Sequence, residues 1–439
     1  MEAPLRVGLA GLGTVGSAVA GMLLRTRDKL AERAGRPIDL VAVASKDPPR
    51  DQSLDLSAIK RSADPIALAR GEGIDVFVEL MGGSGDPAKA SVEAALGVGR
   101  AVVTANKALI AKHGTPLIKL AEQHNAAFNF EAAVGGGIPV IKTLREGLGG
   151  ADISRVYGIL NGTCNYILTQ MQKEGRSFED CLKEAQKLGY AEADPTFDIG
   201  GFDTAHKIAI LASIAFGAEV DADAVYVEGI QSITLADLEA ADDLGYRVKL
   251  LGVAVKTDTG IEQRVHPTMV PKSSSIAQVM GVTNAVTIDG EGIPPITLVG
   301  PGAGGAATAS AVVADIADVA RGIRAKPFGR PVERLRETTK APMERHEGGY
   351  YIRLMARDLA GTAATIATRL AQQKISLESI VQRHPDGVDA NGAAKKASPV
   401  PVILITYATS EDAVYRALEA VQRDKVISGR PQVIRIEKN

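Results

Sequence analysis

The sequence predicts an α/β protein with a doubly wound parallel sheet, followed by an α+β domain and a smaller α+β domain at the carboxyl end. Three observations predict this. A strand, a glycine-rich turn, a helix and a second strand follow one another over residues 6–44. A carboxylate-rich loop enters a long apolar helix over residues 190–216. Hydrophobic periodicity indicates the order βαββαβ over residues 350–436.

The chain length of 439 residues is enough for about two to four domains. We place a nucleotide-binding domain at 1–140 and expect the Ala/Val-rich segment 303–325 to pack back on it. A domain for substrate binding, catalysis and dimerisation follows at 141–302. A Pro- and charge-rich linker at 326–348 leads to the last domain at 349–439.

Composition excludes several classes of function. The formal net charge is -2, which gives no electrostatic reason to expect a nucleic acid or an anionic membrane as partner. The two cysteines, Cys164 and Cys181, cannot build a disulfide framework or a CxxC metal site. There is no signal-peptide pattern and no run of about 18 apolar residues. We therefore expect a cytoplasmic protein with a small-molecule substrate.

The turn Gly11-Leu-Gly-Thr-Val-Gly16 carries the first chemical signal. It lies between strand 6–10 and helix 17–27, and a second strand at 38–44 comes where a βαβ unit requires it. Glycines at these spacings allow a tight turn and let a pyrophosphate approach the backbone at the helix N-terminus. The context predicts a Rossmann-type NAD or NADP site contacted by the residues Gly11, Gly13, Thr14, Val15 and Gly16.

The second strand ends in Ser45-Lys46-Asp47. NAD-selective folds place an acid at this tip to bind the ribose 2′-hydroxyl, whereas Ser45 and Lys46 leave room for a 2′-phosphate. We expect the enzyme to accept NADP. Because Asp47 could bind the ribose 2′-hydroxyl, NAD remains a possible cofactor as well.

Ligands of such sheets bind at the carboxyl ends of the strands. Gly82 follows strand 74–80, and Lys107 follows strand 101–104, so both are candidates for contact with cofactor or substrate. Glu131 ends another strand and precedes three successive glycines, whose exposed carbonyls could coordinate a hard cation together with its carboxylate. The same glycines could equally form a hinge between domains.

Two further segments offer polar groups. A strand-like segment at 152–160 ends in Asn161-Gly162-Thr163, a turn that opens a helix. Cys164 follows, but no histidine is near it in sequence, so we reject it as a nucleophile.

The second segment, 190–207, concentrates acids in front of a helix that carries both Asp203 and Lys207. These two residues are four apart and share one face of the helix. Alone, this spacing would indicate an ordinary surface ion pair. A lysine at the start of an apolar helix with acids around it could instead serve as a general acid or base.

In combination, these motifs closely resemble homoserine dehydrogenases over residues 5–325. The motifs that carry the resemblance are GLGTVG at 11–16, VELMGG at 78–83, TANK at 104–107, EAAVGGGIP at 131–139, NGTCNY at 161–166, GYAEADPTFDIGGFDTAHK at 189–207, HPT at 266–268 and GPGAGGAATASAV at 300–312. Members of this family interconvert homoserine and aspartate 4-semialdehyde with NAD(P), on the route to threonine, methionine and isoleucine. No segment long enough for a kinase precedes Gly11, so we expect the monofunctional form.

The resemblance implies roles for individual residues. It makes Lys207 the proton donor to the aldehyde oxygen and Glu192 the partner of the substrate's amino group. It also implies that Lys107 and Asp203 take part in catalysis and that the substrate is lined by Asp198, Tyr190, Thr163 and Gly162. It places Gly302, Ala303 and Gly304 in a loop over the cofactor. A monovalent cation, sodium, would be held by the side chain of Glu131 and by the carbonyls of Val134, Gly136 and Ile138.

The last ~90 residues resemble an ACT domain, an amino-acid-sensing module with a ferredoxin-like fold. The strands and helices expected here are 350–356, 359–373, 375–383, 402–407, 410–423 and 433–436, with a long loop at 384–401. The Arg357-to-Gly361 turn has Ala360 where ACT domains usually have proline. We expect threonine to bind paired ACT domains in a homodimer or homotetramer and to inhibit the enzyme. A domain that only supports oligomerisation is the alternative.

Two other functions compete with this interpretation. A phosphorylating semialdehyde dehydrogenase needs an activated cysteine beside a histidine, and neither cysteine has that setting. A non-catalytic metabolite sensor would not need the cluster around Lys207, yet the cluster is complete.

Overall fold

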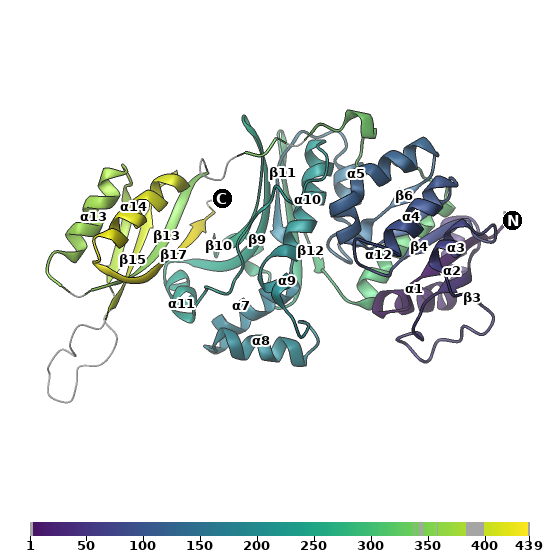
Figure 1. Ribbon diagram of the computed structural model, residues 1–439, viewed down its shortest axis with the longest axis horizontal. Helices are drawn as coiled ribbons and strands as arrows, with labels where there is room; N and C mark the ends of the chain where they lie inside the picture. Colours follow the sequence, from purple (N-terminus) through teal and green to yellow (C-terminus); the bar gives the residue numbers. More distant parts are fainter. Residues whose placement is uncertain (1–2, 338, 342–345, 358, 383–398, 438–439) are drawn as a thin grey trace.

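A computed structural model describes residues 3–337, 339–341, 346–357, 359–382 and 399–437. Three units follow one another along the long axis of the molecule, with the N-terminal unit at one end and the C-terminal unit at the other (Figure 1). Expectations for Asp358, Pro342 and most of the loop at 384–401 lie outside the described residues.

The N-terminal unit is a six-stranded parallel sheet in the order β3-β2-β1-β4-β5-β6. Its strands are β1 (Leu5–Ala10), β2 (Ile38–Ala44), β3 (Lys60–Ser62), β4 (Val76–Glu79), β5 (Ala101–Thr104) and β6 (Phe128–Asn129). The chain order reverses between β1 and β4, and this switch point is where doubly wound sheets bind dinucleotides. The predicted parallel sheet is therefore confirmed.

Helices cover both faces of this sheet. They are α1 (Thr14–Arg25), α2 (Arg27–Ala34), α3 (Pro65–Arg70), α4 (Ala88–Gly97) and α5 (Lys107–Gln123). A much later helix, α12 (Gly305–Ala320), shares a buried core with β1 and α1 through Ala309, Val312 and Ile316. Small residues on α12 permit this close packing, and the helix ties the loop in front of it to the nucleotide-binding unit.

The central unit contains the antiparallel strands β7 (Ile153–Ile159), β9 (Tyr246–Thr257), β10 (Gly260–Pro271), β11 (Thr283–Gly290) and β12 (Ile293–Pro301), in the order β12-β11-β7-β9-β10. Helix α10 (Phe202–Phe216) packs on this sheet, and its run from Ile208 to Ile214 is buried throughout. The other elements of this part of the chain are η1 (Glu131–Ala133), α6 (Val140–Lys142), η2 (Thr143–Gly147), α7 (Gly162–Glu174), α8 (Phe178–Lys187), α9 (Thr196–Ile199), β8 (Tyr226–Val227), α11 (Leu235–Asp243) and η3 (Ser275–Gln278).

Helix α11 lies beyond Gly217, in a part of the chain for which the sequence patterns predict no helix. Its start is fixed by a capping box in which the backbone N–H of Thr234 donates to the carboxylate of Asp237 at 3.0 Å. Thr-x-x-Asp is a weaker signature than the usual form with glutamate or glutamine, which is why it gave no prediction from sequence.

The C-terminal unit contains β13 (Glu347–Ala356), α13 (Thr362–Gln372), β14 (Leu377–Gln382), β15 (Val400–Thr406), β16 (Thr409–Ser410), α14 (Glu411–Arg423) and β17 (Ile427–Ile436). Four strands pair antiparallel in the order β17-β13-β15-β14. Ile366 and Leu370 of α13 and Val414 and Leu418 of α14 share one core with Tyr350 of β13, so both helices cover the same face.

The central and C-terminal sheets are continuous, which the sequence did not predict. β10 pairs in parallel with β17 through Thr268 and Arg435 and through Met269 and Ile436. The described residues between 326 and 341 include η4 (Val332–Arg334) and pair with the central unit through bridges from Arg336 to Ala218 and from Lys340 to Ile261.

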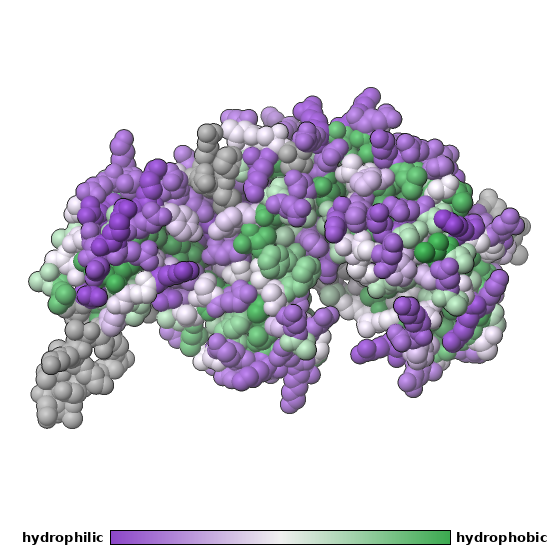
Figure 2. Space-filling view, viewed as in Figure 1, coloured by the Kyte–Doolittle hydropathy of each residue, from purple (hydrophilic) through white to green (hydrophobic). Residues whose placement is uncertain are grey.

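The surface is hollowed by a notch between the N-terminal and central units, on the side of α8 (Figure 2). Within the described residues, no helix is both long enough and apolar enough to cross a bilayer.

Candidate active site

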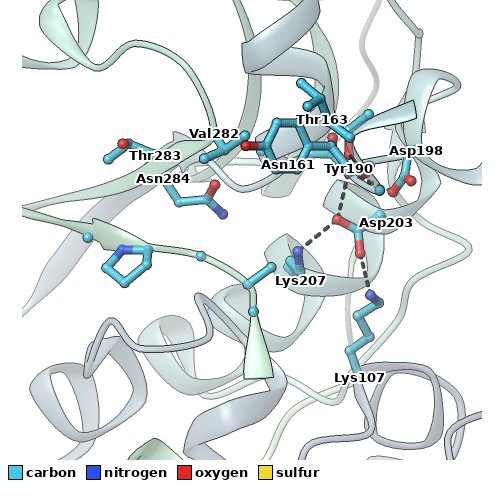
Figure 3. Close-up of a pocket in the computed structure, with 18 residues that line it drawn as sticks. Lys107, Asn161, Thr163, Tyr190, Asp198, Asp203, Lys207, Val282, Thr283 and Asn284 are labelled. Atoms are coloured by element: carbon cyan, nitrogen blue, oxygen red, sulfur yellow. Dashed lines mark hydrogen bonds and ion pairs between the residues drawn. The ribbon is translucent and has the colours of Figure 1, made fainter. Parts of the chain in front are cut away.

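A cavity of about 640 Å³ opens where the central unit meets α5 and the loop before α12. It collects side chains that are far apart in sequence (Figure 3). The residues that line it are Lys107, Asn161, Gly162, Thr163, Leu188, Gly189, Tyr190, Asp198, Asp203, Lys207, Val282, Thr283, Asn284, Gly300, Pro301, Gly302, Ala303 and Gly304. Most of the residues predicted to bind substrate or to act in catalysis therefore share one cavity.

Asp203 lies at the centre of the charged residues. Its Oδ1 lies 2.6 Å from Lys107 Nζ, and its Oδ2 accepts a hydrogen bond from Lys207 Nζ at 2.7 Å. Lys207 comes from the same helix, one turn on, whereas Lys107 begins α5 in the N-terminal unit. The carboxylate thus joins the two units through two lysines.

Asn161 holds the acids in place from the start of α7. Its Oδ1 caps the helix by accepting from Cys164 N at 2.8 Å. Its Nδ2 donates to Asp198 Oδ1 and to Asp203 Oδ2, both at 2.9 Å. One N-cap side chain therefore fixes the helix start and both carboxylates together.

The charges of this cluster set its proton affinities. Burial raises the pKa of Asp203, but the ammonium groups of Lys207 and Lys107 outweigh it, so the pKa lies well below its ordinary value. Burial lowers the pKa of Lys207 despite the attraction of Asp203. For Lys107 burial is outweighed by Asp203, and the pKa is raised. Lys207 is thus the more acidic of the two lysines.

The remaining predicted substrate residues differ in their surroundings. Burial, and then the charge of Asp203, raises the pKa of Asp198. Thr163 Oγ1 donates to the carbonyl of Tyr190 at 2.5 Å, and the Tyr190 ring packs edge-on against Tyr166. Glu192 is exposed and is not among the residues that line the cavity. Its charge nevertheless helps to raise the pKa of Lys107.

Cys164 has no features of a nucleophile. Its thiol is fully buried and donates to the carbonyl of Asp198 at 3.3 Å. Burial and the nearby carboxylates raise the pKa of the thiol well above its usual value, so it stays protonated. This setting argues against covalent catalysis, as the sequence predicted.

A second cavity of about 560 Å³ lies at the switch point of the parallel sheet. Gly11, Gly13 and Lys46 line it, as does Arg50, which the sequence did not single out. Thr14, Val15 and Gly16 form the start of α1 beside it, and a Cβ on Gly16 would lie 1.9 Å from the carbonyl oxygen of Gly11. Only glycine fits there, as the close strand-to-helix turn requires.

The loop at Gly82 is shaped by a buried acid. Glu79 Oε1 accepts from the backbone N–H groups of Met81 and Gly82, and Oε2 accepts from Thr104 Oγ1 at 2.6 Å. Gly82 itself does not line either large cavity.

Comparisons with known proteins agree with this geometry. A family model for the homoserine dehydrogenase NAD binding domain matches residues 11–131, and the model for homoserine dehydrogenase matches residues 139–317. The chain is 44% identical to the homoserine dehydrogenase of Pseudomonas aeruginosa, with 99% of both chains aligned.

The chain belongs to the homoserine dehydrogenase family.

Solved structures of family members extend the match. The crystal structure of a homoserine dehydrogenase from Thiobacillus denitrificans superposes with a TM-score of 0.91 at 41% identity, covering 99% of both chains. A hyperthermophilic archaeal homoserine dehydrogenase in complex with NADPH has a TM-score of 0.61 at 29% identity and covers 72% of this chain. The protein is thus an NAD(P)-dependent oxidoreductase, and the phosphorylating dehydrogenase and the non-catalytic sensor are set aside.

The loop that the homoserine dehydrogenase resemblance assigns to a cation is buried. Glu131 is 3% exposed, and its two carboxylate oxygens accept from the backbone N–H groups of Ile141 and Lys142 at 2.9 and 2.8 Å. Asp315 accepts from the backbone N–H of Glu131 at 2.9 Å, so two carboxylates lie together. Burial and mutual repulsion raise the pKa of Glu131 to about 7, and burial raises that of Asp315 to about 6.

Excess buried negative charge of this kind is chemically suited to a cation, and carbonyls of Val134, Gly136 and Ile138 would add the hard oxygen donors that sodium prefers. Lys142 neutralises part of this negative charge, because its Nζ lies 3.2 Å from Asp315 Oδ1. Among the described residues, no group of three or more His, Cys, Asp or Glu side chains could hold a metal. Any cation here would therefore depend on backbone oxygens.

Sequence reasoning missed three polar residues of the homoserine dehydrogenase site. Asn161 was seen only as part of a turn, although Asn before Gly-Thr at a helix start is a capping signal. Arg50 stands four residues beyond Lys46 in a loop without periodicity. Asn284 lies in a strand far from every other motif, and no local signal marks it.

Proposed function

We propose that this enzyme interconverts L-homoserine and L-aspartate 4-semialdehyde, with Lys207 as the proton donor in the direction of reduction. The observation that carries this proposal is a buried lysine of lowered pKa in the cavity next to the nucleotide-binding unit. The nicotinamide cofactor, when bound, supplies the hydride for reduction and accepts it for oxidation.

The hydrogen bonds of Lys207 leave it one proton to give. Its ammonium group donates to the carbonyl of Leu160 and to Asp203 Oδ2, both at 2.7 Å. An ammonium group has three N–H bonds, so one remains for a substrate oxygen. As the aldehyde carbon receives hydride, its oxygen gains negative charge. Lys207 stabilises this charge, transfers a proton to the oxygen and becomes a neutral amine.

The substrate's ammonium group needs an anionic partner. Asp198 lines the cavity, and burial and Asp203 raise the pKa of its carboxyl group. Because the ionised carboxylate is destabilised there, a positively charged ligand beside it would be favoured. The resemblance assigns Glu192 to the same ammonium group. Its carboxylate lies outside the cavity in this structure, so we propose Asp198 as the nearer of the two partners.

We propose NADPH as the preferred cofactor, with NADH also accepted. Lys46 and Arg50 both line the cavity at the carboxyl end of β2, where a ribose 2′-phosphate would be attracted by two positive charges. We also propose a sodium ion at Glu131, supported by its buried excess negative charge.

The C-terminal unit is proposed to be a ferredoxin-like ACT domain that binds threonine and inhibits the enzyme. Its strand order β17-β13-β15-β14 and its two helices on one face support this assignment. Gly361 caps α13 with a left-handed φ of 91°, a turn conformation in which glycine is favoured. The family resemblance supports a homodimer or homotetramer, which light scattering coupled to size exclusion would measure.

One assay tests these proposals together. Oxidation of NADPH and of NADH is followed with aspartate 4-semialdehyde, with and without threonine. We expect turnover with both cofactors, a lower KM for NADPH and slower turnover with threonine. No turnover with either cofactor would overturn the proposed reaction. Turnover at the same rate with and without threonine would overturn only the proposed inhibition by threonine.

A further inference from the structure

Lys249 is a buried lysine that the proposed chemistry does not use. It belongs to β9 and is 2% exposed. Its Nζ donates to Asn165 Oδ1 at 2.9 Å, to the carbonyl of Val279 at 2.5 Å and to Met280 Sδ at 3.5 Å. An ammonium group has three N–H bonds and accepts none, so these three neutral acceptors match its donors in number.

This position is an expensive one for a positive charge. Burial, and then the positive charges of Arg247 and Lys173, lower the pKa of Lys249 to about 7. None of its three hydrogen bonds is to a carboxylate, so no opposite charge offsets the loss of water. An apolar side chain of similar size would avoid this cost. The hydrogen bonds of Lys249 therefore point to a use beyond the stability of the fold.

Lys249 fixes the orientation of the Asn165 amide. Because an ammonium group only donates, the amide turns its oxygen toward Lys249 and its nitrogen away from it. Asn165 Nδ2 then donates to the carbonyls of Val279 and Thr283, both at 3.2 Å. A reversed amide would place its oxygen against two carbonyl oxygens, which repel it. The lysine thus decides whether Asn165 can hold these two carbonyls.

These bonds hold the segment 279–283 against α7. Thr169, one turn beyond Asn165 on the helix, accepts from the backbone N–H of Gly281 through its Oγ1 at 3.1 Å. The start of the helix lies equally close, since a Cβ on Gly162 would be 2.7 Å from the carbonyl oxygen of Val282. The segment is therefore fixed to the helix whose first residues line the cavity.

The end of this segment forms one wall of the active-site cavity. Val282, Thr283 and Asn284 line the cavity, and Figure 3 shows them together on the side away from Lys107. Lys207 comes from α10 and bonds to its own carboxylate on that helix. Lys249 and Asn165 therefore act on the shape of the space for the substrate, whereas the proton donor is held separately.

We propose that Lys249 is a positioning residue, which orients the Asn165 amide and thereby holds the cavity wall from Val282 to Asn284 in place for the substrate. This inference rests on the proposed function, since it takes the substrate to be L-homoserine. It gives a role to a lysine outside every motif of the family resemblance.

The first test replaces Lys249 by methionine, which has nearly the same length and no N–H bond. The Asn165 amide is then free to turn, and the wall loses its fixed position. KM for L-homoserine should rise about tenfold. The value of kcat should stay near that of the wild type, because Lys207 keeps its contacts. The Kd for NADPH should not change, because the dinucleotide turn lines the other cavity.

A second variant separates positioning from folding. Asn165→Asp gives Lys249 a carboxylate partner, which neutralises its buried charge, but this side chain has no N–H to donate to the two carbonyls. KM should therefore rise as in Lys249→Met, while the melting temperature should not fall below that of the wild type. Lys256→Met, on the same strand but exposed and paired with exposed Asp152, is the control and should keep the wild-type KM.

Two results would overturn the inference. A wild-type KM in Asn165→Asp, or in Lys249→Met with an intact melting transition, would show that the wall does not depend on this pair. A fall in kcat at unchanged KM would show that Lys249 acts on the proton donor and not on the wall. Failure of the proposed function is distinguishable from both, because the wild type itself would then not oxidise homoserine.

Discussion

Asp203 and Lys207 form a buried ion pair on consecutive turns of α10, with Lys207 Nζ donating to Oδ2 at 2.7 Å. The same i,i+4 spacing on a helix surface stabilises a protein by only a few tenths of a kcal/mol. Here the side chains are 3% and 9% exposed, and Lys107 reaches the other carboxylate oxygen. The pair therefore serves the chemistry of the site more than the stability of the helix.

Replacing Lys207 by alanine should lower kcat by about 10²–10⁴-fold, the usual contribution of a positioned general acid. The Kd for NADPH should stay unchanged because Lys207 lies in the other cavity from the dinucleotide turn. Steady-state assays and a fluorescence titration with NADPH measure both. Lys187→Ala, an exposed lysine on α8, is the matched control. Near-normal turnover of Lys207→Ala would refute the assignment.

Replacing Asp203 by asparagine should shift the pH profile of reduction. Asp203 raises the pKa of Lys207 against the effect of burial, and Lys107 lowers it. Without the carboxylate the pKa of Lys207 falls further. Reduction needs protonated Lys207, so kcat should begin to fall at a lower pH than in the wild type. A profile of kcat against pH that keeps its alkaline limb in place would contradict this role.

Replacing Lys46 by alanine should change cofactor preference. Lys46 is exposed at the rim of the second cavity, so it can attract a 2′-phosphate without being needed for folding. We expect kcat/KM to fall about tenfold to a hundredfold with NADPH and to stay the same with NADH, since losing a charged hydrogen bond costs about 1.5–3 kcal/mol. Lys29→Ala on α2 is the control. An equal loss of kcat/KM with both cofactors would argue against a role of Lys46 in binding the 2′-phosphate.

Sodium should stabilise the protein through Glu131. The carboxyl group of Glu131 has a pKa of about 7 in the folded protein and an ordinary pKa of 4.5 in the unfolded chain. As the pH rises, the unfolded chain therefore loses this proton at a lower pH than the folded protein does. The free energy of unfolding should therefore fall between pH 4.5 and pH 7. A bound cation would lower the pKa of Glu131 and reduce this fall.

The measurement is the melting temperature at pH 5 and pH 7 in sodium chloride and in choline chloride at equal ionic strength. The wild type should melt higher in sodium chloride at pH 7, and Glu131→Gln should show no difference between the salts. Equal melting temperatures for the wild type in both salts would remove the cation from this site.

Local sequence patterns were enough for much of the fold. The turn from Gly11 to Gly16 places glycines where the backbone itself approaches the helix, so its spacing, together with the strands and the helix around it, predicts the dinucleotide site. The order of strands and helices along the chain of the C-terminal unit also follows from local periodicity. The helix at 235–243 was missed because its capping box has aspartate in place of glutamate.

The sequence by itself determined the nucleotide fold, the family and the helix that carries Asp203 and Lys207, because each depends on neighbours within one or two turns. Only the tertiary structure decided the pairing of Lys107 with Asp203, the exposed position of Glu192 and the buried place of Asn284. The tertiary structure also decided that burial outweighs the attraction of Asp203 and lowers the pKa of Lys207. These depend on contacts between distant segments and on exclusion of water, which packing creates and residue order does not record.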